Sequence, residues 1–185
     1  MFSIARSIAI ATLALTGAGA ADFGPLMEVA KATWPEKKHL GVIADYSRSA
    51  EAVQELAMEA GEGMSITVVD CRDSLQINRA EKILLAKVKP DILVLLPDDP
   101  QIHDGTFQTT VTVGHASLYG VPTIATKPIA IRQGAVFAIG PETGMELLLT
   151  TRMKGTVDVI LPNRVTFGPK VSSLRRPATI RVLPQ

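Results

Sequence analysis

The chain has 185 residues, with 19 Lys or Arg, 18 Asp or Glu and 3 His, which gives a formal net charge of +1 at pH 7. A charge this close to zero attracts neither nucleic acid nor an anionic membrane surface, so we expect no nucleic-acid partner. Hydrophobic residues make up 46% of the chain and aromatic residues 4%. This composition favours helices packed on a parallel sheet over a sandwich or an aromatic-lined carbohydrate site.

The first twenty residues have the pattern of a bacterial export signal. A single cation, Arg6, precedes an apolar run at residues 8–15, and Ala18-Gly19-Ala20 supplies the small residues that a signal peptidase accepts. The apolar run ends at Thr16-Gly17, short of the roughly 20 residues that cross a bilayer. We therefore expect a periplasmic mature chain that begins near Ala21, with an uncleaved N-terminal anchor as the alternative.

The mature chain is long enough for one domain around a single core. It contains one cysteine, Cys71, so no disulfide can form within the chain. This cysteine follows the apolar run Ile66–Val69, and we interpret it as a small packed side chain at a strand end. A nucleophilic thiol is the alternative interpretation.

From residue 38 onward, short β-branched runs alternate with amphipathic segments, which predicts βαβ units and a parallel sheet. In the first half we predict strands at 40–44, 65–69 and 91–96, with helices at 49–60 and 77–88 between them. Asp73 and Gln76 have the spacing of a capping box at the second helix, and Pro90 ends that helix. The run 91–96 shows no alternation, which indicates a strand covered on both faces.

The second half continues the same alternation. Phe107, Val111, Gly114 and Leu118 recur at helical spacing and predict a helix over 106–119. Strands are expected at 123–126 and 135–139, followed by a helix at 142–154 whose residues Met145, Leu148, Leu149 and Met153 face the sheet. Short strands at 157–161 and 164–167 would belong to an irregular tail from about residue 156, which ends in an apolar run at 179–183. The fold class expected for residues 21–185 is therefore a single α/β domain, a flavodoxin-like parallel sheet flanked by helices.

In such a sheet, ligands bind at the carboxyl ends of the strands, near the point where the strand order reverses. The candidate ligand-binding residues are those that follow the predicted strands, namely Asp45, Tyr46, Ser47, Ser49, Asp98, Asp99, Thr126, Lys127, Gly140, Glu142 and Thr143. Acids, hydroxyls and one cation suit a small polar or zwitterionic ligand. The alternative is that these are ordinary turn and cap residues, because Asp, Ser, Thr and Gly are common in such loops.

We expect neither a metal nor a cofactor, and we expect that the protein is not an enzyme. Asp98-Asp99, His103 and Asp104 include metal-ligating types, but no second histidine stands at a ligand spacing. The chain contains no Gly-x-Ser-x-Gly elbow, no Walker loop and no Gly-x-Gly-x-x-Gly after the first strand. An enzyme that uses Asp98 or Cys71 is the weaker alternative, because no paired acid and base can be located.

Five segments together resemble the periplasmic substrate-binding proteins of ABC transporters, which have the type I periplasmic-binding fold and include members that bind aromatic amino acids. These segments are Trp34–Ile43, Asp45-Tyr46-Ser47, Pro90–Val94, Gly120–Ile124 and Gln133–Gly140. In that family two lobes close on the ligand, and this chain resembles the second lobe. The resemblance implies ligand contacts from Ser47, Ser49 and Asp98. Two features differ from the family: the first lobe is missing, and Pro141-Glu142 stands where the family has Asp-Tyr.

These observations lead to two functional hypotheses. The first is a non-catalytic solute-binding protein whose partners are a small-molecule ligand and an ABC permease or another periplasmic protein, with a homodimer as one way to complete the cleft. The second is an accessory or regulatory module that docks on a membrane sensor or a periplasmic enzyme, with the apolar run at 179–183 adding a strand to its neighbour.

Overall fold

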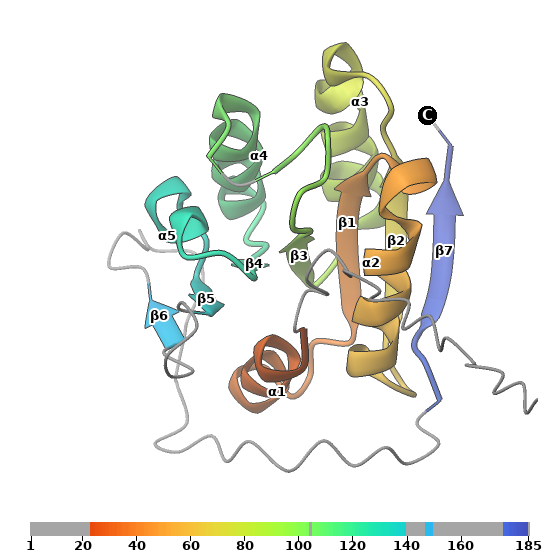
Figure 1. Cartoon of the computed structure of the whole chain (residues 1–185), viewed down its shortest axis with the longest axis vertical. Coiled ribbons are helices and arrows are strands. Elements are labelled where there is room, and N and C mark those ends of the chain that lie inside the picture. The colour runs from red at the N-terminus through yellow and green to blue at the C-terminus, as the bar shows by residue number, and fades with distance from the viewer. Residues whose placement is uncertain (1–22, 104, 140–146, 150–175, 185) are drawn as a thin grey trace, which may run out of the picture.

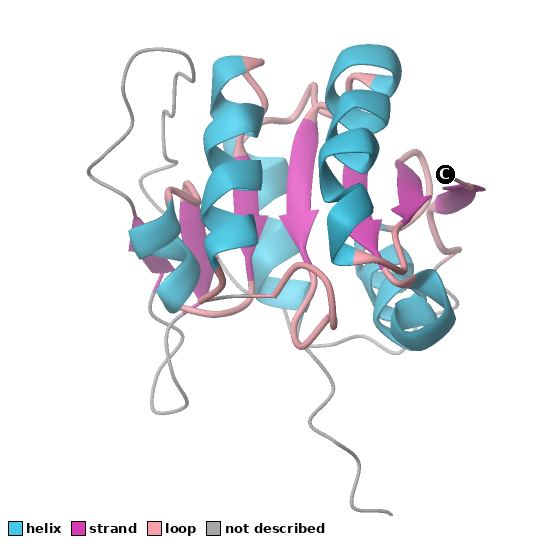
Figure 2. Cartoon of the chain, turned by 90° about the horizontal axis from the view of Figure 1, so that it is seen from above, coloured by secondary structure: helices cyan, strands magenta, loops and turns pink. Residues whose placement is uncertain are grey.

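The computed structural model describes residues 23–103, 105–139, 147–149 and 176–184. These residues form a seven-stranded sheet with the strand order β6-β5-β4-β3-β1-β2-β7, and helices cover both of its faces (Figures 1 and 2). Six of the strands are parallel, and β6 alone runs antiparallel, against β5. The predicted fold class, a flavodoxin-like α/β sheet flanked by helices, is thus confirmed.

The central strands lie within one or two residues of their predicted bounds. They are β1 (His39–Ala44), β2 (Ser65–Asp70), β3 (Ile92–Leu95), β4 (Thr123–Ala125) and β5 (Phe137–Ile139). Every residue of β3 is buried, as expected for a strand with helices on both of its faces.

Alternate side chains of the strands enter two separate cores. On one face, Leu40 and Val42 of β1 belong to a cluster with α1 (Phe23–Thr33) and α2 (Tyr46–Ala60). On the other face, Ile43 belongs to a cluster with the remaining helices, which are α3 (Ile77–Glu81), the π-helix η2 (Lys82–Val88), α4 (Phe107–Leu118) and α5 (Ile129–Gln133). The period of two along a strand explains this division.

The sequence analysis did not predict α1, although this helix is well buried. Phe23, Leu26 and Met27 have no exposed surface, and Trp34 just after the helix stacks on Phe137 of β5 with ring centroids 5.4 Å apart. Gly24 and Pro25 both have low helix propensity, so the sequence pattern does not predict a helix at this position. Proline is nevertheless compatible with the first turn of a helix, where its missing N–H would have no partner.

The helix predicted over 77–88 consists of two parts. It starts after a short 3-10 turn, η1 (Ser74–Gln76), which Asp73 caps by accepting the Leu75 N–H at 2.9 Å. It continues as α3 and then as η2, and it ends at Lys89, where φ is 55° and the residue precedes Pro90. Gly41 of β1 allows this end to pack closely, because a Cβ at Gly41 would lie 2.6 Å from Cγ of Pro90.

Two predictions for the C-terminal part of the chain were wrong. Leu147–Leu149 form the edge strand β6 instead of part of a helix, because extended backbone there fills the open hydrogen-bonding edge of β5. Thr179–Leu183 form the regular strand β7, which runs parallel to β2 along its whole length. This pairing places the apolar end of the chain in its own sheet. The strands predicted at 157–161 and 164–167 lie outside the described residues.

The helix predicted over 106–119 is present as α4, but its apolar stripe faces away from the sheet. Phe107 and Leu118 are 77% and 81% exposed, whereas Thr109, Thr112, Val113 and Ala116 form the buried face. Small and β-branched side chains allow the helix to lie close to the sheet, and the larger side chains are left outside.

No helix within the described ranges combines the length and the apolarity that a membrane crossing requires.

Candidate functional site

The strand order reverses between β1 and β3, because the chain goes from β1 to β2 on one side and then crosses to β3 on the other. The loops that follow these two strands therefore meet at the carboxyl edge of the sheet. Crevices of this kind hold the ligand in open α/β sheets, and this edge is where the sequence analysis placed the site.

Asp99 joins the two loops and is completely buried. Its Oδ2 accepts hydrogen bonds from the backbone N–H of Asp45 at 2.9 Å and from the hydroxyl of Ser49 at 2.6 Å. Its Oδ1 accepts the N–H groups of Gln101 and Ile102 at 2.9 and 3.1 Å. Four donors occupy the carboxylate, so Asp99 and Ser49 hold the loops in place rather than facing solvent.

The loop after β1 is ordered by carboxylates as well. Asp45 is buried and caps α2 by accepting the N–H of Ser47 at 3.1 Å and its hydroxyl at 2.6 Å. The N–H of Tyr46 donates to Oδ1 of Asp70 at 3.0 Å, and the side chain of Tyr46 packs partly buried against the core. Ser47 is the exposed member of this loop. Asp45 thus has the role of a helix cap, and Ser47 is available at the edge.

Exposed polar groups follow β3 and β4. The side chain of Asp98 is 82% exposed, and Asp98 has φ of 57°, a left-handed conformation that Asp and Asn tolerate better than other non-glycine residues. Its carboxylate pairs with the ammonium group of Lys127, which comes from the loop after β4. The hydroxyl of Thr126 is buried and has no hydrogen-bond partner. An exposed ion pair can exchange partners with the charged groups of a zwitterion.

Three of the predicted site residues, Gly140, Glu142 and Thr143, lie outside the described residues, as does Asp104 of the acidic loop. Within the described part of the chain, no three His, Cys, Asp or Glu side chains gather closely enough to hold a metal ion. Cys71 is buried at the end of β2, in agreement with its interpretation as a packed side chain.

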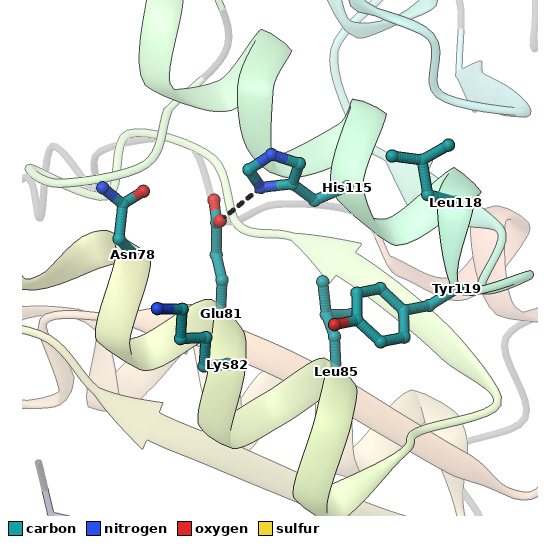
Figure 3. A pocket seen from close by; sticks show the side chains of 7 residues that line it. All are labelled: Asn78, Glu81, Lys82, Leu85, His115, Leu118 and Tyr119. Atoms are coloured by element: carbon teal, nitrogen blue, oxygen red, sulfur yellow. Dashed lines mark hydrogen bonds and ion pairs between the residues drawn. The ribbon is translucent and has the colours of Figure 1, made fainter.

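Sequence reasoning missed a second site, which lies between α3–η2 and α4 (Figure 3). Glu81 is buried there, and its carboxylate accepts a 2.5 Å hydrogen bond from the Thr112 hydroxyl and lies 2.6 Å from Nδ1 of His115. A pocket of about 490 Å³ opens above this pair. It is lined by Asn78, Glu81, Lys82, Leu85, His115, Leu118 and Tyr119.

The sequence did contain a signal for this second site. Glu81 is an acid next to Ala80 on the buried side of an otherwise basic helix, and Thr112 lies on the sheet-facing side of α4. A buried acid and a buried hydroxyl on facing helices predict a contact, because each then satisfies the other. The sequence pattern instead suggested that the face of α4 with Phe107 and Leu118 is buried, so Thr112 was expected to face solvent.

No protein-family model matches the chain, and no match was found among curated proteins. A solved structure with a similar fold is an ABC domain from Streptococcus pneumoniae in complex with L-Trp, with a TM-score of 0.53 and 18% sequence identity. The similarity covers 63% of this chain and 38% of the other, so this chain spans well under half of that protein. At this level of identity the comparison establishes that the described part of the chain shares its α/β fold.

Proposed function

We propose that this protein is a non-catalytic, periplasmic substrate-binding-like protein that recognises a small polar solute at the carboxyl edge of its sheet. The observation that carries the proposal is the position of Ser47, Asp98 and Lys127. Ser47 lies in the first turn of α2, Asp98 in the loop after β3 and Lys127 in the loop after β4. These segments follow three neighbouring strands at the carboxyl edge, and two contacts join them, Asp45 with Asp99 and Asp98 with Lys127.

The chemistry of this edge suits an amino acid. A ligand ammonium group would pair with Asp98, and a ligand carboxylate would pair with Lys127. The resemblance to substrate-binding proteins that bind aromatic amino acids supports this proposal. The structural neighbour is an ABC domain in complex with L-Trp, which makes L-Trp the first solute to test.

A single sheet edge covers only one side of such a ligand. Binding sites for small molecules usually enclose most of the ligand surface. We therefore propose that a second lobe completes the cleft and that it is supplied by a second copy of the chain or by another periplasmic protein. The proposed functional partner of the assembled cleft is an ABC permease.

Isothermal titration of the purified mature chain with L-Trp and then with the other amino acids tests the proposal, with the size of the complex measured by sedimentation. We expect saturable binding that Lys127→Met weakens by about tenfold, which corresponds to about 1.4 kcal/mol, because the variant keeps the aliphatic stem and loses the charge. Lys87→Met, which removes an exposed cation from η2, is the matched control and should bind like the parent.

Two results would argue against solute recognition at this edge. One is the absence of binding to any amino acid at about 1 mM, by either the monomer or a dimer. The other is equal affinity of Lys127→Met and Lys87→Met, which would place the ligand elsewhere on the molecule.

A second candidate function is that of an accessory module that docks on another protein. The end of the chain does not supply a free strand for this purpose, because β7 pairs with β2. The observation that favours docking is instead the exposed apolar stripe of α4.

A further inference from the structure

Large apolar side chains gather at the outer surface of α3 and α4. Among the described residues, Leu75, Phe107 and Leu118 are the three most exposed large hydrophobic side chains, at 87%, 77% and 81%, and Tyr119 at the end of α4 is exposed as well. Isolated apolar residues on a surface are ordinary, but a group of them around one groove indicates an interaction site.

The surface between these side chains is concave. The 490 Å³ pocket beside Leu118 and Tyr119 shares Asn78 and Glu81 with a second pocket of about 250 Å³ beside Leu75 and Phe107. Together the two pockets form one groove along both helices, which we call the α3–α4 groove. Figure 3 shows its larger half, where Tyr119 extends from the end of α4 toward Leu85 of η2. An amphipathic helix fits a groove of this shape, whereas a flat lipid surface would leave it unfilled.

The base of the groove is firmly held. Glu81 of α3 connects the two walls, because one of its carboxylate oxygens is bonded to Thr112 of α4 and the other to His115 of α4. Immediately after Glu81 the helix changes from α to π geometry. Short π segments inside helices are frequent at functional sites.

The charges of the groove identify the class of partner. Lys82 lines the groove and is exposed, and Arg79 on α3 is exposed as well, whereas the only acid that lines the two pockets is Glu81, which is buried and already bonded. The α4 wall contains no Asp, Glu, Lys or Arg. Among its lining residues the groove therefore presents the positive charge of Lys82 and no exposed acid.

We propose that the α3–α4 groove binds an amphipathic helix of a partner protein. Its apolar face would lie between Phe107, Leu118 and Leu75, and Asp or Glu residues at its border would pair with Lys82 and Arg79. The proposal is independent of solute binding, because the groove lies over one face of the sheet and the solute site lies at the carboxyl edge.

Three other occupants do not fit the groove. Two copies of the groove facing each other would bring Lys82 and Arg79 against the same cations. The acidic face of α2 in a second copy offers only Met58 as an exposed large apolar side chain, which is too little to fill the groove. Residues 150–175 of the chain carry five Lys or Arg and one Asp, so their charge does not complement the groove either.

Three synthetic peptides of about 18 residues test this proposal by fluorescence anisotropy against the full-length mature chain. The first has a Leu stripe at helical spacing bordered by Glu, the second has Lys in place of Glu, and the third is a scrambled form of the first. We expect the first peptide to bind at least tenfold more tightly than the others. The double variant Phe107→Ser/Leu118→Ser should lose at least tenfold in affinity, and Lys82→Glu should reverse the preference between Glu and Lys.

Met58→Ser on α2 is the matched control, because it removes an exposed apolar side chain far from the groove, and it should leave peptide affinity unchanged. All the substituted side chains are exposed, so circular dichroism should give unfolding midpoints close to that of the parent. Lys127→Met should bind the peptide normally, which separates this proposal from solute recognition.

Four outcomes would overturn the proposal. Equal affinity for the Glu and Lys peptides would show that charge does not select the partner. Equal affinity for the Glu peptide and its scrambled form would show that an amphipathic helix is not what the groove recognises. Concentration-dependent dimers in sedimentation that Phe107→Ser/Leu118→Ser abolishes would identify a second copy as the occupant. Binding to phosphatidylglycerol vesicles without affinity for the peptides would identify a lipid surface.

Discussion

Asp98 and Asp99 are chemically identical neighbours with opposite environments. Asp98 is exposed, adopts a left-handed backbone conformation and pairs with Lys127, whereas Asp99 has no exposed surface and accepts four hydrogen bonds. The sequence placed both in the same turn as candidate ligand contacts. Their different roles depend on the direction of each side chain after β3, which no sequence pattern specifies.

Exchanging each acid for its amide should therefore have very different effects on stability. In Asp99→Asn the new NH2 group must face at least one backbone N–H donor on whichever side it lies, so we expect the free energy of unfolding to fall by about 1–3 kcal/mol. Asp98→Asn keeps a residue type that tolerates positive φ and loses only an exposed ion pair, so its change should stay within about 0.5 kcal/mol. Urea denaturation of both variants measures the difference, and equal losses would contradict the buried role of Asp99.

Burial of polar side chains was the main residue-level property that could not be predicted. The contrast between Thr112, which is buried against Glu81, and Phe107, which faces solvent, runs against the usual preference of each residue type. Hydrophobic spacing predicted that a helix exists here, but it did not indicate which side faces the sheet. Sequence analysis therefore located the candidate residues at the sheet edge and missed the groove.

At the level of elements, local patterns predicted β1 to β5 and the longer helices between them. Each has its own signal, such as the alternation of apolar runs, the cap at Asp73 and the helix end before Pro90. The two edge strands have no comparable signal. Leu147–Leu149 and Thr179–Leu183 become strands because β5 and β2 offer them unpaired backbone groups, a tertiary effect that depends on distant parts of the chain.

Removal of β7 should expose the edge of β2. A chain that stops before Thr179 should have a lower free energy of unfolding, and amide hydrogen exchange in Ser65–Asp70 should speed up. The amides of β3 and β4 should keep more of their protection, because these strands lie farther from that edge. A chain that stops before Gln185 is the control. Unchanged exchange in β2 would show that β7 contributes little to the edge.

The whole molecule presents two surfaces with different chemistry. The carboxyl edge of the sheet presents the exposed Asp98–Lys127 ion pair, at which we propose solute binding, and the α3–α4 groove presents apolar area beside Lys82. Because the two surfaces share no residue, variants can disable one and leave the other intact. An adaptor that links solute capture to a second protein would need this arrangement.

Export of the chain is a prediction for the molecule as a whole. Expressed with its first twenty residues in a Gram-negative host, the protein should appear in the periplasmic fraction with a mass that begins at Ala21. Replacing the Ala18 and Ala20 pair with Leu should block cleavage and give the full-length mass in the membrane fraction. An intact N-terminus on a protein confined to the cytoplasm would contradict both the signal and the proposed location.

Trp34 has a practical consequence for such experiments. It is the only tryptophan of the chain, and its indole is buried against Phe137 where the N-terminal helix meets the sheet. Its emission should shift to longer wavelength when this helix detaches, so the single tryptophan reports whether α1 is packed on the sheet. The same property complicates optical titrations with L-Trp, because added ligand would mask the native signal.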